Sequence, residues 1–403
     1  MAENEDQHLG VHPDILKLGV VSFLTDVSSE MIFSIFAIFF TAIAGASAAL
    51  LGLVEGLADF SASSLDYVSG WLSDQTGKRK IFSLVGYGFS ALTKTILLVT
   101  TSVAALGLFR VVERLGKSFR GPPRDAWLSG ISSKERRGYS FGVHKALDKA
   151  GAVAGPLVAY GLLSWQGQTA SAFRLLFWLA IIPAILAVLL LSWIPDRSPS
   201  DPHSGQVEPE EGILTAWKTL SASFKRYLVA AGLFSLAYFS FGFLLLRANA
   251  AGFSAADTVL LYALFNTSFV IAAPFAGKVG DRYGRARVVV LGYAIYAIMN
   301  VGFALASAKW QIIVLFILYG VFFAIDEGQN KAFISDLETN RRATAIGLYN
   351  FVTGAIYLPA SLLTGVLWSV SEPLAFLTAA AISLAAIVML LGLRPRVSPT
   401  ERN

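Results

Sequence analysis

Long runs of apolar residues alternate with short polar breaks along almost the whole of this 403-residue chain. A helix rises 1.5 Å per residue and needs about 20 residues to cross the hydrocarbon layer of a bilayer. Read with a window of about 19 residues, each run is long enough, and together they predict an all-α membrane protein with twelve transmembrane helices. The predicted helices cover residues 15–43, 47–72, 79–101, 103–127, 138–164, 171–194, 227–249, 257–280, 286–307, 311–335, 341–367 and 373–393.

Lys and Arg gather in alternate loops between these helices. Residues 78–80 and 341–342 are basic, whereas residues 45–49 and 100–104, in opposite loops, carry no charge. The positive-inside rule predicts that the basic loops are cytoplasmic, and an even number of helices then places both termini there. The first sixteen residues are polar and acidic and lack the pattern of a signal peptide, so we expect the first helix to be retained as an anchor.

The longest polar break, residues 196–212, is rich in Pro, Ser and acidic residues, a composition typical of a disordered linker. The following stretch places Ile213, Trp217, Leu220 and Phe224 on one helical face, which favours a helix lying flat at the cytoplasmic interface. An unstructured start of the seventh helix is the alternative. The predicted organisation is therefore an N-terminal six-helix bundle (1–195), a cytoplasmic linker with an interfacial helix (196–226) and a C-terminal six-helix bundle (227–403).

The composition supports the membrane assignment and excludes several functions. Apolar residues make up 55% of the chain and charged residues only 15%, whereas soluble proteins have about 25% charged residues. The absence of cysteine excludes thiol catalysis, disulfides and metal sites built from Cys. We attribute the net charge of +5 to basic cytoplasmic loops rather than to nucleic-acid binding. No cofactor is expected.

Two landmarks of the first half of the chain recur in the second. The segment from Gly70 to Arg79 (GWLSDQTGKR) matches the segment from Gly277 to Arg285 (GKVGDRYGR), with Gly, Asp and Gly each 207 positions later. The arginine pair at 136–137, followed by Gly142, matches the pair at 341–342, followed by Gly347, 205 positions later. Two matched landmarks at nearly the same spacing indicate duplicated six-helix halves, which one transporter architecture contains as parallel repeats.

The repeated Gly-x-x-x-Asp-x-x-Gly segment resembles the signature loop of the major facilitator superfamily, and the resemblance extends over both halves. It implies the fold of two pseudo-symmetric bundles, alternating access and a bacterial inner membrane. The first copy has Gln75 where Arg is usual, while the second keeps Arg282. The resemblance also implies a conformational latch made of Gly70, Asp74, Gly77, Arg79, Gly277, Asp281, Arg282, Gly284 and Arg285.

The fifth predicted helix contains Gly142, Gly151, Gly155 and Pro156. Their spacing resembles the helix-5 motif of the superfamily's drug and proton antiporters, although Ala159 stands where that motif has another Gly. The resemblance implies antiport. Small residues also let helices approach closely and Pro bends a helix, so a packing face without influence on transport direction is the alternative.

Ionisable residues inside the predicted helices are the main candidates for chemistry. Such a side chain costs at least about 2.5–3.5 kcal/mol at the bilayer centre and should face a polar cavity. Asp26 and Glu30 share one face of the first helix. Arg110 lies in a region that resembles the superfamily's helix-4 motif, whose Arg is linked to proton transfer, although Glu113 and Arg114 replace its Gln and Gly. We predict proton coupling at Asp26, Glu30, Arg110 and Glu113, with Asp26 first; a permanent ion pair between helices 1 and 4 is the alternative.

Other polar residues within the helices are candidates for a substrate cavity. The titratable residues concentrate in the N-terminal half, so we expect this half to perform proton coupling and the C-terminal half to supply more of the substrate surface. The cavity candidates are Glu55, Asp59, Arg114, Lys117, His144, Asp148, Arg247, Asn266, Asp326, Asn330 and Asn350.

These features predict a monomeric secondary transporter, with a small molecule, protons and lipid as its partners, that exports an organic molecule such as a drug or metabolite by proton antiport. An anionic solute or siderophore is an alternative substrate, which the basic cluster of Arg110, Arg114, Lys117, Lys145 and Lys149 favours. A metal-ion exporter is a further alternative, although four histidines and no cysteine disfavour a soft-metal site. A membrane receptor is the non-transport alternative. An enzyme has no support, because the chain has no metal-ligand pair, phosphate loop or nucleophile motif in context.

Overall fold

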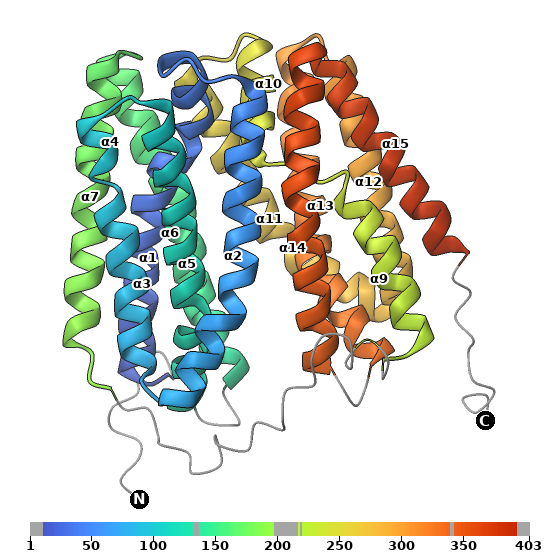
Figure 1. The fold of residues 1–403 in the computed structure, drawn as a ribbon, viewed down its shortest axis with the longest axis horizontal. Helices are drawn as coiled ribbons and strands as arrows, with labels where there is room; N and C mark the ends of the chain where they lie inside the picture. Colours follow the sequence, from blue (N-terminus) through green and yellow to red (C-terminus); the bar gives the residue numbers. More distant parts are fainter. Residues whose placement is uncertain (1–10, 133–136, 197–216, 218–219, 339–341, 393–403) are drawn as a thin grey trace, which may run out of the picture.

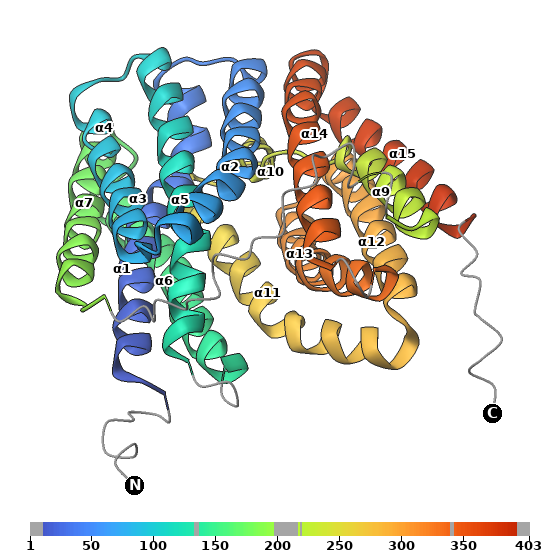
Figure 2. The ribbon, with the colours of Figure 1, turned by 60° about the horizontal axis from the view of Figure 1, so that its bottom comes forward.

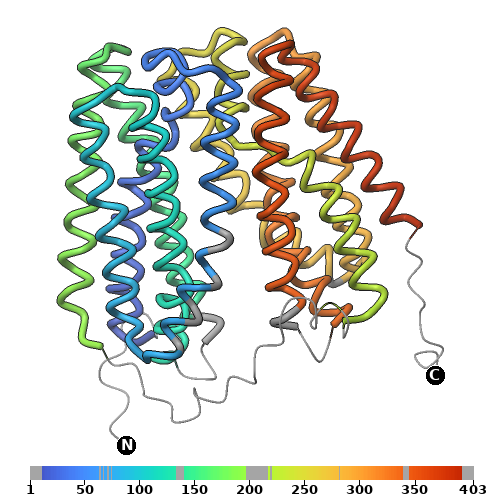
Figure 3. Tube along the Cα trace, viewed as in Figure 1, coloured from blue at the N-terminus to red at the C-terminus, as the bar shows by residue number. Residues whose placement is uncertain are grey.

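The computed structural model describes residues 11–132, 137–196, 217, 220–338 and 342–392. Its side chains are described throughout these ranges except at residues 63–64, 67, 70–71, 74, 137–139, 281 and 342–344. Figure 3 traces the chain from the N-terminus to the C-terminus. Of the predicted interfacial helix, residues 213–216 and 218–219 lie outside the described ranges. Leu220 and Phe224 are described and are buried in a hydrophobic core, and Phe224 belongs to the next helix, which begins at Ala222 rather than at residue 227.

The described chain is helical along almost its whole length. Every one of the twelve predicted spans is occupied by a helix or by two helical pieces. These are α1 (Pro13–Ile38) with η1 (Phe39–Ile43), α2 (Ala48–Thr76), α3 (Arg79–Thr93) with α4 (Ile96–Val99), α5 (Val103–Ile131), α6 (Arg137–Gln166), α7 (Ala170–Trp193), α9 (Ala222–Ser235) with α10 (Phe241–Ala250), α11 (Ala255–Tyr283), α12 (Arg285–Leu305), α13 (Lys309–Leu337), α14 (Arg342–Val370) and α15 (Glu372–Leu391).

Eight of these spans are long and apolar enough to cross a membrane by length and composition alone, within the part of the chain that the structure describes. The remaining spans are α2, α5, α6 and the pair α9 and α10. Helices α2, α5 and α6 carry several of the charged residues singled out in the sequence, and α9 and α10 are each short. Charge and interruption therefore lower the apolar signal of these four spans, whereas α1, which holds Asp26 and Glu30, is among the eight.

Two spans are interrupted, and a third ends in a different kind of helical turn. A π-helical turn, η1, ends the first span, α3 and α4 are separated at Lys94 and Thr95, and residues 236–240 separate α9 from α10. The Ser240 hydroxyl restarts the chain as α10 by accepting a hydrogen bond from the backbone N–H of Gly242 at 3.2 Å. Interruptions of this kind leave backbone groups without helical partners, which is tolerated only where protein surrounds them.

The helices form two groups that lie side by side. Figures 1 and 2 show α1–α7 in one group and α9 and α12–α15 in the other, with α10 and α11 reaching toward the boundary. We call the first group, residues 13–193, the N half and the helices from α9 to α15, residues 222–391, the C half. The predicted all-α membrane fold of two six-helix bundles is confirmed.

The two halves repeat an individual contact. Arg79 begins α3, and its Nη1 donates to the carbonyl oxygen of Ala126 at 3.0 Å. Arg285 begins α12, and its Nη1 donates to the carbonyl oxygen of Ala332 at 3.1 Å. In both halves the arginine and the carbonyl are separated by 47 residues. The duplicated sequence therefore folds into duplicated structure.

The halves meet closely at one end, the end of η1 and Gly45. A methyl group on Gly56 of α2 would lie 3.0 Å from the carbonyl oxygen of Leu358 in α14. One on Gly365 of α14 would lie 2.7 Å from the carbonyl oxygen of Ala48. Glycine thus lets α2 and α14 touch backbone to backbone at the Gly45 end. The two helices diverge toward the opposite end, where α2 ends at Gly77 (Figure 1).

Candidate functional site

A buried ionic network occupies the interior of the N half. Arg110 on α5 holds Glu55 of α2 in two parallel hydrogen bonds, 2.7 Å from Nε to Oε1 and 2.8 Å from Nη2 to Oε2. Its third nitrogen, Nη1, lies 3.3 Å from Oε2 of Glu113. The guanidinium also lies 4.4 Å from the ring centre of Phe33. Because Arg110 is only 4% exposed, this pairing satisfies charges that the membrane interior would otherwise leave unpaired.

A second ion pair lies one helical turn further along the same two helices. Arg114 donates to Oδ1 of Asp59 at 3.1 Å from Nε and 2.8 Å from Nη2. Both pairs join residues 55 positions apart, so α2 and α5 run in parallel with matched charges. On α5 the side chains of Arg114 and Lys117 are 33% and 37% exposed, whereas Arg110 before them and Arg120 after them are 4% and 2% exposed.

The two carboxylates of α1 face Lys117. The Nζ atom of Lys117 lies 3.9 Å from Oδ1 of Asp26 and 3.9 Å from Oε1 of Glu30. Both acids are buried. Glu30 also accepts a hydrogen bond from the hydroxyl of Tyr262, which belongs to α11 in the C half. The carboxylate of Glu30 therefore contacts both halves at once.

Lys94 is a member of this network that sequence reasoning missed. It lies in the break between α3 and α4, and its Nζ donates to the hydroxyls of Ser28 at 2.6 Å and Ser29 at 3.1 Å. The Ser29 hydroxyl in turn donates to Oε1 of Glu113 at 3.2 Å. A single lysine within an otherwise apolar span was the signal that could have found it.

The glycines of α6 bring this helix against α1 beside Asp26. A methyl group on Gly151 would collide with the carbonyl oxygen of Phe23 and lie 3.1 Å from Cβ of Asp26. One on Gly155 would lie 2.6 Å from the carbonyl oxygen of Val27. Gly142 has no atom within 4 Å of such a group, so it lies outside this close packing. Pro156 lies inside α6.

His144 and Asp148 lie apart from the Arg110 network. The Nε2 atom of His144 lies 3.0 Å from the hydroxyl of Ser22, which also accepts from Arg124 at 3.2 Å. Asp148 forms an ion pair with Lys145 at 3.3 Å.

The C half contains a smaller polar cluster on α13. Asn330 accepts a hydrogen bond from the Tyr227 hydroxyl at 2.9 Å and donates to Oδ1 of Asp326 at 2.7 Å and to the Tyr349 hydroxyl at 3.0 Å. This cluster borders stacked rings, among them Tyr227 and Tyr349. Asp326 and Asn330 therefore lie together.

Three other cavity candidates of the C half lie away from that cluster. Arg247 donates to the carbonyl oxygens of Phe303 at 2.9 Å and Ala306 at 2.5 Å, where it ties α10 to the end of α12. Asn266 is buried and donates to the carbonyl oxygen of Tyr262 in its own helix at 3.1 Å. Asn350 is exposed on α14.

The predicted latch is described only in part. The side chains of Asp74 and Asp281 lie outside the described residues. Gly77 ends α2 with φ of 66°, and Gly284 separates α11 from α12 with φ of 94°. The guanidinium of Arg282 lies 5.4 Å from the ring centre of the adjacent Tyr283.

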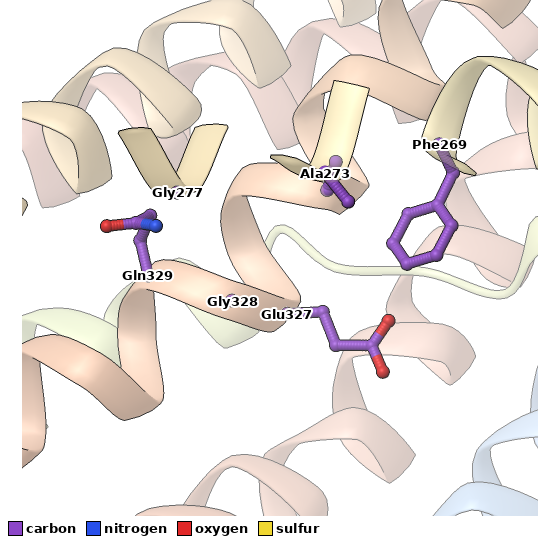
Figure 4. A pocket seen from close by; sticks show the side chains of 7 residues that line it. Phe269, Ala273, Gly277, Glu327, Gly328 and Gln329 are labelled. Atoms are coloured by element: carbon purple, nitrogen blue, oxygen red, sulfur yellow. The ribbon is translucent and has the colours of Figure 1, made fainter. Parts of the chain in front are cut away.

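A recess of about 330 Å³ opens between α11 and α13 near the Gly77 end. Figure 4 shows Phe269, Ala273 and Gly277 from α11 on one wall and Glu327 and Gln329 from α13 on the other. Lys149 of α6 also contacts Phe269, with its Nζ 4.5 Å from the ring centre. The recess therefore lies beside a contact between the two halves.

The comparisons with known proteins identify the class. A model of the Major Facilitator Superfamily matches residues 18–270 and 228–403, and the chain belongs to this family. It is 33% identical over 399 residues to the uncharacterized MFS-type transporter MJ1317 of Methanocaldococcus jannaschii, covering 97% of each chain.

Solved structures share the fold at low sequence identity. The crystal structure of the nucleoside transporter NupG matches with a TM-score of 0.77 at 14% identity, covering 94% of this chain and 98% of that one. A POT family transporter in complex with 5-aminolevulinic acid matches with a TM-score of 0.79 at 11% identity, covering 98% of both chains. The protein is thus a secondary transporter in a membrane that moves a small molecule, and it is not an enzyme.

Proposed function

We propose that the chain is a proton-coupled exporter of a small organic molecule and that its proton binds to the acidic pair of α1. The observation that carries the proposal is the position of Asp26 and Glu30, both 3.9 Å from Lys117, with Glu30 also bonded to Tyr262 of the C half. When ionised, these two acids and one lysine carry one surplus negative charge. One proton neutralises the group.

Proton binding is coupled to movement through the contact between Glu30 and Tyr262. An ionised carboxylate accepts a hydrogen bond about twice as strong as a neutral acceptor does. Loss of the charge on Glu30 therefore weakens a contact that joins the halves. A ligand shifts a conformational equilibrium only when it binds two states with different affinity, and a proton on Glu30 meets that condition.

The carrier with a bound proton and the carrier without one then differ in which end of the molecule is open. In the structure the halves touch at the Gly45 end, and α2 and α14 diverge toward the Gly77 end (Figure 1). The basic loops predict that the Gly77 end is cytoplasmic. In this arrangement the substrate enters from the cytoplasm, and a proton from the opposite side replaces it after the halves exchange contacts.

The aromatic surface around Tyr262 supports an organic substrate. The ring of Phe33 lies 5.7 Å from that of Tyr262, and Phe241 lies 4.9 Å from Tyr262 on its other side. Aromatic rings from both halves therefore border the contact between Tyr262 and Glu30, which the substrate replaces when it binds. Flat apolar surface of this kind suits a molecule with an aromatic or aliphatic body.

The alternatives of an anion carrier and a metal-ion exporter have less support. Glu55 accepts two hydrogen bonds from Arg110 and Asp59 accepts two from Arg114, so both guanidinium groups are already paired with a carboxylate of the protein. Among the described residues, no group of three His, Asp or Glu side chains could hold a metal ion.

The test is transport by the purified chain in liposomes. Proton movement is recorded with a pH-sensitive dye while cationic, neutral and anionic organic molecules are supplied in turn. Substitution Asp26→Asn or Glu30→Gln should abolish proton-driven transport of the molecule that responds. The exposed Asp125 of α5 provides the control Asp125→Asn, which should leave transport unchanged. Proton coupling that survives both Asp26→Asn and Glu30→Gln would overturn the proposal.

A further inference from the structure

Lys94 is a buried ammonium group held by hydroxyls rather than by a carboxylate. It is 1% exposed, and it lies where α3 ends and α4 begins. Among the described residues, no Asp or Glu forms an ion pair with it; its hydrogen bonds go to Ser28 and Ser29 of α1. A lysine in such surroundings changes its charge more readily than one paired with an acid.

The two serine hydroxyls donate hydrogen bonds to different acceptors. Each hydroxyl has one proton to donate. Ser28 donates its proton to the carbonyl oxygen of Ala180 at 2.5 Å, so this branch ends at the backbone. Ser29 donates its proton to Oε1 of Glu113 at 3.2 Å, so this branch leads to a carboxylate. The hydrogen bonds from Lys94 through Ser29 to Glu113 all point in one direction.

We infer that Lys94 is a second proton-carrying residue, which exchanges its proton with Glu113 through the hydroxyl of Ser29. In the forward step an N–H bond of Lys94 breaks as that proton binds Oγ of Ser29. The original hydroxyl proton of Ser29 moves to Oε1 of Glu113. A neutral amine and a neutral acid result, and no other reactant is needed. The inference rests on the proposed function only for its consequence in transport.

The charged groups around Lys94 are of both signs. Asp26 of α1 and Glu113 of α5 attract the ammonium, and Lys117 and Arg120 of α5 repel it. The third neighbouring helix, α7, contributes the backbone carbonyl of Ala180. Charges of both signs therefore lie around this buried amine.

The proton on Glu113 has a consequence beyond the relay. Oε2 of Glu113 accepts from Nη1 of Arg110 at 3.3 Å, and Arg110 in turn holds Glu55 of α2. Neutral Glu113 releases this part of the guanidinium. The charge state of Lys94 therefore affects the contact between α2 and α5 through Glu113 and Arg110.

The first experiment measures the charge of Lys94 directly and needs no substrate. The protein is purified in detergent with ¹³C at the Cε atoms of its lysines, and the variant Lys94→Arg identifies the Lys94 signal. We expect this signal to titrate between about pH 6 and 11, and Glu113→Gln to move its midpoint. A Lys94 signal that stays at one position over this range, or that Glu113→Gln leaves in place, would overturn the inference.

The second experiment compares the two serines in liposomes with the substrate found in the transport panel. Ser29→Ala cuts the relay, and we expect proton-driven transport to fall about 100-fold, while exchange of substrate without a proton gradient continues. Ser28→Ala removes an equal hydroxyl from Lys94 and should change transport little. Ser29→Thr keeps the hydroxyl and should restore activity. Equal effects of Ser28→Ala and Ser29→Ala would contradict the relay.

These outcomes separate the inference from the proposed function. A titrating Lys94 whose midpoint depends on Glu113, in a protein that transports normally with Asp26→Asn and Glu30→Gln, would refute the acidic pair as the proton site and leave Lys94 in place. A static Lys94 in a protein inactivated by Asp26→Asn would have the opposite meaning.

Discussion

Glu30 of the N half accepts a hydrogen bond from Tyr262 of the C half. The two bonded residues are 232 positions apart along the chain, and their bond joins the two bundles next to Lys117. A contact that must break when the halves separate is expected to influence the balance between conformations.

Substitution Tyr262→Phe should shift that balance toward the state in which the Gly45 end is open. Loss of a hydrogen bond to a charged group costs about 1.5–3 kcal/mol, so the equilibrium should change by about 10- to 100-fold. Distances between spin labels on α2 and α14 would report the shift. The control is Tyr296→Phe, which removes a hydroxyl bonded to the carbonyl oxygen of Ala237 within the C half. Equal label distances in both variants would contradict the expected link.

The two ion pairs between α2 and α5 should differ in their contribution to stability. Glu55→Gln leaves Arg110 buried beside a neutral amide, and breaking a buried pair costs about 3–5 kcal/mol. Asp59→Asn affects a pair that is about a third exposed, and exposed pairs contribute about 0–1 kcal/mol. Thermal unfolding in detergent should therefore show a much larger loss for Glu55→Gln. Similar losses would mean that the Arg110 pair is not isolated from water.

Gly151→Ala should damage the packing of α6 on α1 directly beside Asp26. The added methyl group meets the backbone of Phe23, which cannot rotate away, and overpacking of this kind costs about 1–3 kcal/mol. Transport and thermal stability should both fall. Gly161→Ala is the control in the same helix, because nothing lies within 4 Å of its methyl group. Gly142→Ala adds a comparison: a loss of transport there, where no packing changes, would show that the helix-5 motif acts by other means.

Two turn glycines should respond differently to the same change. Gly77 has φ of 66° and ψ of 3°, close to a conformation that other residues adopt at a cost of about 1–2 kcal/mol. Gly284 has φ of 94° and ψ of 130°, a region almost closed to side chains, where strain is of order 1–3 kcal/mol. Thermal unfolding should show a greater loss for Gly284→Ala than for Gly77→Ala. The reverse order would mean that the turn at Gly284 relaxes easily.

The positions of the helices could be predicted because membrane burial demands about 20 apolar residues per span. The interruptions could not, since a long window averages over them. The restart at Ser240 depends on a cap and on neighbouring helices rather than on apolar content. Lys94 escaped notice for a related reason: one charge barely lowers the average of its span.

The partners within the candidate site were harder to predict than its members. Asp26, Glu30 and Arg110 were recognised as costly charges in the membrane, but their pairing depends on which helices touch. Arg110 pairs with Glu55 of α2, and it is Lys117 rather than Arg110 that forms ion pairs between the fourth membrane span and the acids of the first. Glu55 and Asp59 are four positions apart, as are Arg110 and Arg114, and this equal spacing is the sequence pattern expected for paired charges on two parallel helices.

Arg79 and Arg285 each fasten the start of one helix to a carbonyl in the same half. Each bundle thus contains its own contact of this kind. A carrier supplied as two polypeptides, divided between α7 and α9, should consequently fold as two self-supporting pieces that reassemble in the bilayer. Co-purification of the two pieces would test this expectation. Repeating it with either arginine substituted would show whether each bundle needs its own contact in order to fold.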